Sequence, residues 1–176
     1  MLLNPKLFVL PHEEIKAQGL QNLTYGSLTM KGVHAMSHII QKHIKSHLIQ
    51  GFDLGCGDGE LIYHFQQSLP ESTWYGVEIS DHRVSSQVRD VCIWQGDMLK
   101  ESFKPYTVLH ADNLCLEDSI ACSLEKKIAD EFTGLYITYR KPSNLHFLKK
   151  AILLETVTTE TSWSECLVSY YWIGSL

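Results

Sequence analysis

The chain has 176 residues, of which 44% are hydrophobic and 20% charged, and its formal net charge is −5 at pH 7. This length accommodates one domain with a hydrophobic core, and no apolar stretch is long enough to predict a membrane-spanning helix. The negative charge argues against direct binding to nucleic acid, because neutralising phosphates requires clustered Lys and Arg side chains.

The first predicted helix covers Thr29 to Gln50, where apolar residues recur every three or four positions and form one stripe. A short apolar strand follows and enters the glycine-rich stretch 51–60, GFDLGCGDGE. Helical spacing resumes at Leu61 and ends at Pro70. This order predicts a helix, a buried strand, a tight glycine turn and a second helix.

The middle of the chain alternates between strand and helix patterns. The segment 73–79 is rich in β-forming residues, and 80–90 is expected to be a polar helix capped by Ser80 or Asp81. An amphipathic helix is predicted at 116–132. The remaining strand candidates of this part are 92–97, 107–112 and 134–142.

The tail holds two more strands, 151–160 and 166–174, with no room between them for a crossover helix, so they are expected to pair as an antiparallel hairpin. Strands that alternate with helices and end in a hairpin indicate one α/β domain. We predict a Rossmann-like, doubly wound, mostly parallel seven-stranded sheet with an antiparallel C-terminal hairpin. Ligands of such sheets bind outside the carboxyl ends of the strands.

The glycine-rich turn runs from Asp53 through Gly55, Gly57 and Gly59 to Glu60. Its spacing is G-x-G-x-G, whereas the dinucleotide-binding fingerprint is G-x-G-x-x-G. Acidic residues in the turn are unfavourable beside a pyrophosphate, and they suit a ligand with an amino group and a sulfonium. The alternative is a tight strand-to-helix turn that binds no ligand.

Two further strands also end in acidic residues. Glu78 ends the second strand, where a carboxylate can hold ribose hydroxyls. Asp97 ends the third, where a carboxylate can accept a hydrogen bond from an exocyclic amine and Met98 can lie on a purine. In order and spacing this series resembles the class I S-adenosylmethionine-dependent methyltransferases, which implies S-adenosyl-L-methionine as the cofactor.

The resemblance narrows to the non-SET histone-lysine methyltransferases, the disruptor of telomeric silencing family, and runs from about Thr24 to Tyr171. TYGSLT (24–29) is similar to the family's cofactor-covering segment, and TSWSECLVSYYWI (161–173) is similar to its closing hairpin. Asp112 and Asn113 stand where the family has Val-Asn-Asn-Phe. The chain departs from the family pattern at four positions, namely Ser27, Glu60, Asp112 and Leu114.

The resemblance implies a division into an N-terminal segment with a cofactor-covering loop, 1–28, and a methyltransferase domain, 29–176. The acceptor is expected to be a lysine amine of a protein substrate. Trp163 and Tyr170 would line the lysine channel, and Asp112 or Asn113 would accept a hydrogen bond from the amine. The residues expected to hold the cofactor are Tyr25, Asp53, Gly55, Gly57, Gly59, Glu60, Glu78, Asp97, Met98 and Asp112.

Other interpretations stay open. The acceptor is alternatively a small-molecule or nucleobase amine, or the chain is a cofactor-binding module without catalysis. Aromatic residues of a hairpin ordinarily serve packing, and Asp112-Asn113 also suits a turn or helix N-cap. The histidine pairs His34/His38 and His43/His47 have no third ligand, so no metal site is expected.

The N-terminal sequence MLLNPKLFVLP lacks the basic region and the small-residue cleavage site of a secretory signal. The five cysteines are scattered and form no CxxC pair, which indicates reduced thiols in a reducing compartment. We therefore expect an intracellular protein of the cytoplasm, with the nucleus or a host cell as alternatives.

Overall fold

The computed structural model describes residues 4–45 and 48–175. Its centre is a seven-stranded sheet with the strand order β3-β2-β1-β4-β5-β7-β6. The first five strands pair in parallel, and β7 runs antiparallel to both of its neighbours, β5 and β6. This arrangement confirms the predicted fold class and the C-terminal hairpin. The strands are β1 (Ile49–Leu54), β2 (Ser72–Glu78), β3 (Cys92–Gln95), β4 (Val108–Ala111), β5 (Gly134–Thr138), β6 (Ala151–Glu160) and β7 (Glu165–Ile173).

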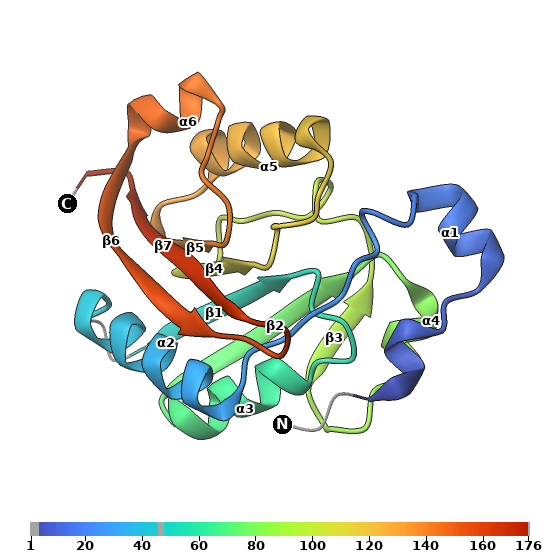
Figure 1. Cartoon of the computed structure of the whole chain (residues 1–176). Helices are drawn as coiled ribbons and strands as arrows, with labels where there is room; N and C mark the ends of the chain where they lie inside the picture. Colours follow the sequence, from blue (N-terminus) through green and yellow to red (C-terminus); the bar gives the residue numbers. More distant parts are fainter. Residues whose placement is uncertain (1–3, 46–47, 176) are drawn as a thin grey trace.

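Helices cover both faces of the sheet (Figure 1). On one face α2 and α3 enclose a core that contains Val33, Phe65 and Trp74, and on the other face α5 and α6 enclose a core that contains Leu124 and Phe147. The short α4 and the N-terminal helices lie at the β3 end of the sheet. The helices are η1 (Pro5–Phe8), α1 (His12–Gln18), α2 (Met30–His43), α3 (Glu60–Ser68), α4 (Asp81–Val84), α5 (Asp118–Glu131) and α6 (Leu145–Lys150).

The predicted first helix is too long. The structure ends α2 at His43 and places Ile49 and Gln50 in β1, where they pair with β2. Leu48, which belongs to the apolar stripe in the sequence, is 69% exposed. The stripe is misleading because Leu48 keeps the four-residue spacing from Ile44 although it lies between the helix and β1.

Two other helices differ from the prediction, and β5 ends at Thr138, four residues before the end of the predicted strand 134–142. The polar helix expected at 80–90 has only four residues, although its Ser80 cap is confirmed because the side chain accepts a hydrogen bond from the backbone N–H of Arg83. Helix α6 is absent from the prediction, although Asn144 caps it by accepting from the N–H groups of His146 and Phe147. Both helices are short, so neither repeats its apolar spacing over the window of about 11–18 residues from which an amphipathic helix is predicted.

None of the helices within the described ranges is long and apolar enough to cross a membrane.

The tip of the β6–β7 hairpin contacts the segment that precedes α2. The backbone N–H of Ser162 donates to the carbonyl of Ser27 at 2.7 Å, and the Ser162 hydroxyl accepts from the Ser27 N–H at 3.2 Å. Leu28 and Thr161 form an isolated antiparallel bridge. The hairpin tip near the C-terminal end is therefore hydrogen-bonded to the segment near the N-terminal end that precedes α2.

The close contact between β1 and β2 predicts a stability effect. A Cβ added at Gly51 would lie 2.3 Å from the ring of Trp74, which is fully buried and stacks on Phe65. Gly51→Ala should therefore lower the free energy of unfolding by about 1–3 kcal/mol, the usual cost of overpacking. Urea titration measures the change. Thr73→Ala, at an exposed position of β2, is the control and should shift the free energy by less than about 0.5 kcal/mol.

Candidate active site

A cavity of about 180 Å³ opens at the carboxyl ends of β1 to β4. Its walls come from the strand ends and from the N-terminal segment, and they include Tyr25, Gly55, Glu78, Asp97 and Asp112. A second cavity of about 20 Å³ shares Tyr25, Gly55 and Asp112 and adds Asp53 and His110. The location agrees with the rule for α/β sheets, and most of the residues predicted to hold a cofactor line one of the two cavities.

The glycines of the turn after β1 serve different purposes. Gly55 has φ +86°, and a Cβ added there would meet no atom within 4 Å, so a side chain would extend into the open cavity. Gly57 has φ +60°, and a Cβ there would lie 2.3 Å from the Tyr25 ring. Gly55 thus leaves space for a ligand, whereas Gly57 leaves space for Tyr25. Neither Gly57 nor Gly59 lines the two cavities.

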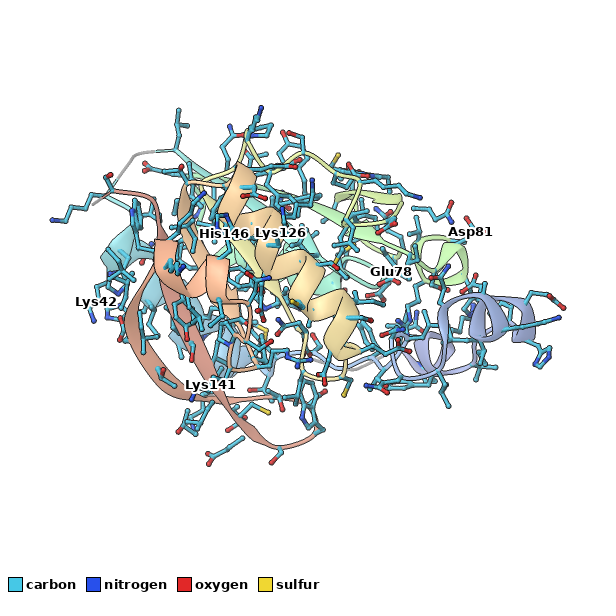
Figure 2. All side chains as sticks on the ribbon, turned by 90° about the horizontal axis from the view of Figure 1, so that it is seen from above. Lys42, Glu78, Asp81, Lys126, Lys141 and His146 are labelled. Atoms are coloured by element: carbon cyan, nitrogen blue, oxygen red, sulfur yellow. The ribbon has the colours of Figure 1, made fainter. Side chains whose placement is uncertain are left out.

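Glu78 is held at the end of β2 by two hydrogen bonds and one ion pair. Its Oε2 accepts from the Gly57 N–H at 2.9 Å, its Oε1 accepts from the Ser80 N–H at 2.9 Å, and Arg83 Nη1 lies 3.8 Å from Oε1. Burial raises the pKa of the Glu78 carboxyl, and Arg83 and the two N–H groups oppose that shift. Figure 2 shows Glu78 in the interior and Asp81 of α4 at the outer edge.

Asp97 and Met98 both line the wall of the larger cavity, and their contact with a purine stays a prediction. The Oδ1 atom of Asp97 accepts from the Leu99 N–H at 2.9 Å, which fixes the turn after β3. The carboxylate is partly exposed, so it remains able to accept a hydrogen bond from a ligand.

Asp112 lies between the two cavities and lines both of them. Burial is the main reason that the pKa of its carboxyl lies above the ordinary value of 3.8, and Asp53 raises it further. His110 and the Leu114 N–H act in the opposite direction. A carboxyl in this environment takes up a proton more readily than an exposed aspartate, which is a property of a general base.

The side chain of Asn113 does not face the cavities that its neighbour Asp112 lines. Its Oδ1 accepts from the Thr138 hydroxyl at 2.9 Å and from the Tyr139 N–H at 3.1 Å, and its Nδ2 donates to the Tyr136 hydroxyl at 3.2 Å. The side chain is buried and lines neither cavity. In this structure Asn113 therefore joins the end of β4 to β5 and does not reach the place predicted for an amine.

Three further predicted site residues lie outside both cavities. Trp163 is 45% exposed and covers Gly26, a residue of the cavity wall. Tyr170 is fully buried in the core under α2 and α3. Glu60 pairs with Arg89 and His64 on the outer side of the glycine turn. Their direct contact with cofactor or acceptor stays a prediction.

The N-terminal segment forms one wall of the larger cavity, and only part of that wall was singled out from the sequence. Thr24 and Tyr25 belong to the stretch 24–29 that resembles a cofactor-covering segment, whereas Gln18, Gln21 and Asn22 also line the cavity and were not predicted. Glu14 holds the segment in place, because its carboxylate accepts from the Ser80 hydroxyl at 2.5 Å and from the His82 N–H at 3.1 Å. Arg83 donates to the carbonyls of Leu7 and Leu23. No residue type in this stretch distinguishes it from an ordinary polar loop.

These contacts predict the effect of Glu14→Ala on the N-terminal segment. Hydrogen bonds to a charged group contribute about 1.5–3 kcal/mol each, so their loss should increase local opening of residues 4–23 by about 10-fold or more. Hydrogen exchange measured by mass spectrometry detects the change. The exposed neighbour Glu13 supplies the control, since Glu13→Ala removes no such bond. Unchanged exchange in Glu14→Ala would contradict this role.

Three buried polar residues beside the smaller cavity form a chain of hydrogen bonds that was not predicted from the sequence. His110 Nδ1 lies 2.7 Å from Asp53 Oδ1, and His110 Nε2 lies 3.1 Å from the Tyr139 hydroxyl. All three residues are buried. The sequence contains a hint, because His110 stands two residues before Asp112 and alternate residues of a strand share a face.

No protein-family model matches the chain, and no curated protein matches it. Solved structures do match. An S-adenosylmethionine-dependent methyltransferase from Clostridium acetobutylicum ATCC 824 has a TM-score of 0.56 at 10% identity, over 83% of this chain and 92% of the other. The plantazolicin methyltransferase BpumL in complex with SAH has a TM-score of 0.59 at 11% identity, over 83% of each chain.

A geranyl diphosphate methyltransferase in complex with GPP and sinefungin has a TM-score of 0.54 at 14% identity, over 80% of this chain and 77% of the other. The likeness to these structures is one of fold. The chain thus has the Rossmann-like fold seen in S-adenosylmethionine-dependent methyltransferases. The narrower resemblance to histone-lysine methyltransferases remains a hypothesis.

Proposed function

We propose that the protein is an S-adenosylmethionine-dependent methyltransferase that acts on an amine. The observation that carries the proposal is the cavity itself, where Gly55 leaves open space and Glu78, Asp97 and Asp112 surround it at three successive strand ends. The neighbouring structures are methyltransferases, and their shared fold agrees with this assignment.

The charge of the site supports this cofactor. The two cavities are lined by four carboxylates, those of Asp53, Glu78, Asp97 and Asp112, and by Arg83, which already faces Glu78. An excess of negative charge suits a ligand that carries both a sulfonium and an ammonium, and it disfavours a pyrophosphate. Glu78 would hold the ribose hydroxyls, Asp97 and Met98 the adenine, and Asp53 and Gly55 the amino-acid end.

The cofactor supplies a methyl group bound to a positively charged sulfur. The protein then has to align the acceptor and remove its proton. An amine with the ordinary lysine pKa near 10.4 is mostly protonated at pH 7, and neutralising it costs roughly 4–5 kcal/mol. Asp112, with its raised pKa, accepts the proton from the ammonium, so that the lone pair of the nitrogen becomes free to attack. Asp112 is then a carboxylic acid, and its carbonyl oxygen can still accept a hydrogen bond from the neutral amine and so orient it.

The first candidate for the acceptor is a lysine side chain of a protein. Gly26 belongs to the wall of both cavities, and the exposed ring of Trp163 lies directly on it. An aromatic face beside the site can bind an arriving ammonium through cation–π attraction. Because Tyr170 is buried in the core, Trp163 is the one of the two predicted channel residues that is available at the surface.

A small-molecule amine is the second candidate. Two of the neighbouring structures are a plantazolicin methyltransferase and a geranyl diphosphate methyltransferase, and neither is named as a lysine methyltransferase. The fold is compatible with either acceptor, so the choice between a protein lysine and a small amine rests on the labelling experiment.

Calorimetry and a labelled-methyl assay test the proposal in sequence. Calorimetry should show binding of S-adenosylmethionine, and absence of binding would overturn the assignment. Tritiated cofactor is then offered with histones, other proteins and a set of small amines. Label on a protein lysine supports the first candidate, and label only on a small amine supports the second. A chain that binds the cofactor and labels neither would be a non-catalytic binding module.

A further inference from the structure

The buried chain of Asp53, His110 and Tyr139 lies beside the smaller cavity, which all three residues line. Asp53 and His110 are register partners on the parallel strands β1 and β4, and Tyr139 directly follows β5. The strand pairing therefore sets the distance between the carboxylate and the imidazole. The proposed methyl transfer assigns no role to His110 or Tyr139, so their hydrogen bonds to each other and to Asp53 need a separate explanation.

The chemistry of the three groups determines the direction of the hydrogen bonds. An ionised carboxylate only accepts, so the Nδ1 atom of His110 carries the hydrogen that is donated to Asp53. In a neutral imidazole Nε2 is then the acceptor, and it receives the Tyr139 hydroxyl hydrogen. Burial raises the pKa of that hydroxyl well above its ordinary value, so Tyr139 keeps its proton and remains a donor.

Only Oδ1 of Asp53 takes part in this chain, and no hydrogen bond within the described residues occupies Oδ2. The wall of the same cavity contains Ser27, which is 5% exposed and whose hydroxyl has no hydrogen-bond partner in the described part of the chain. A buried hydroxyl without a partner costs free energy unless a ligand satisfies it. A carboxylate oxygen and a hydroxyl donor together match an ammonium and a carboxylate, the two groups of an amino acid.

We propose that His110 and Tyr139 are positioning residues for the cofactor: they fix the Asp53 carboxylate so that its Oδ2 atom binds the ammonium group of the cofactor's amino-acid end. The inference rests on the proposed function, and it adds two residues that touch Asp53 and act through it. An acceptor that is already oriented loses less conformational freedom on binding, which increases affinity.

Two ligands separate this role from a general structural one. S-adenosylhomocysteine contains the amino-acid end, and methylthioadenosine lacks it while keeping the adenosine and the sulfur. Calorimetry with both ligands is carried out on the full chain. In His110→Phe the affinity for S-adenosylhomocysteine should fall by about 10- to 100-fold, the factor that corresponds to a hydrogen bond to a charged group, and the affinity for methylthioadenosine should stay within about twofold.

Milder variants keep the test valid if His110→Phe does not fold. Tyr139→Phe removes one hydroxyl and should reduce the affinity for S-adenosylhomocysteine by about 3- to 10-fold, the range of a neutral hydrogen bond. His110→Asn places an amide donor near Asp53 and should recover most of the loss. Tyr136→Phe is the matched control, because Tyr136 lies in β5 three residues before Tyr139 and its buried hydroxyl faces the opposite side of the sheet. This variant should not change the ratio of the two affinities.

The outcomes are distinguishable. Equal weakening of both ligands in Tyr139→Phe, or an unchanged affinity for S-adenosylhomocysteine, would overturn the positioning role while leaving the proposed function intact. Binding of neither ligand by the unaltered chain would overturn the proposed function. A selective loss of S-adenosylhomocysteine binding that His110→Asn restores supports the inference.

Discussion

Replacing Asp112 with asparagine should lower the rate of methyl transfer by about 10²- to 10⁴-fold, the contribution of a general base. The substitution keeps the shape of the side chain and removes its ability to take a proton. Cofactor affinity should change far less, because the acids at the ends of β2 and β3 remain. Single-turnover rates at saturating cofactor measure the effect, and transfer at the full rate would remove Asp112 from the mechanism.

The pH dependence of the rate gives a second measurement on the same residue. Burial raises the pKa of the Asp112 carboxyl, so the carboxylate takes up a proton at a higher pH than the ordinary value of 3.8. Activity should therefore fall as the pH decreases through that raised pKa, and this acidic limb should disappear in Asp112→Asn. The exposed Asp90 provides the control, since Asp90→Asn should leave both the rate and the limb unchanged.

Glu78→Ala should affect both stability and cofactor binding. The substitution removes the acceptor for the N–H groups of Gly57 and Ser80 and leaves the buried guanidinium of Arg83 without its carboxylate. Removing one partner of a buried ion pair costs about 3–5 kcal/mol, so the free energy of unfolding should fall by that amount. Binding of S-adenosylmethionine should weaken by more than about 100-fold, because the glycine turn and the ribose site are lost together.

Urea titration and calorimetry measure the two effects of Glu78→Ala. Glu78→Gln keeps one oxygen acceptor and the shape of the side chain, so it should lose less stability than the alanine variant while still weakening the cofactor. Glu71→Gln, at an exposed position, controls for the loss of one negative charge. Wild-type stability in Glu78→Ala would show that the turn is held by other contacts.

The sequence predicts the sheet and the strand-end acids well because both follow short-range rules. Alternating elements determine the order of strands, and Glu78, Asp97 and Asp112 lie at the carboxyl ends of predicted strands. The position of Asn113 could not be predicted in this way. It is adjacent to Asp112 in the chain, but its side chain points to the other side of the strand, and its hydrogen-bond partners come from a strand 25 residues later.

Long-range pairing also explains the other differences. The end of α2 depends on whether Ile49 pairs with β2, which periodicity within one segment cannot show. His110 looks like an ordinary residue of a buried strand until Asp53 appears beside it in the register. Likewise, Glu14 gains its role only through contact with Ser80, a residue 66 positions away.

The hydrogen bonds between Ser27 and Ser162 join residues 135 positions apart. Contacts of such large sequence separation form late, because the chain between them must first be ordered. During synthesis the strand ends with their acids emerge well before the hairpin tip that fastens the covering segment. The part of the cavity wall that Gly26 and Ser27 supply is therefore fastened only after the last two strands have been made.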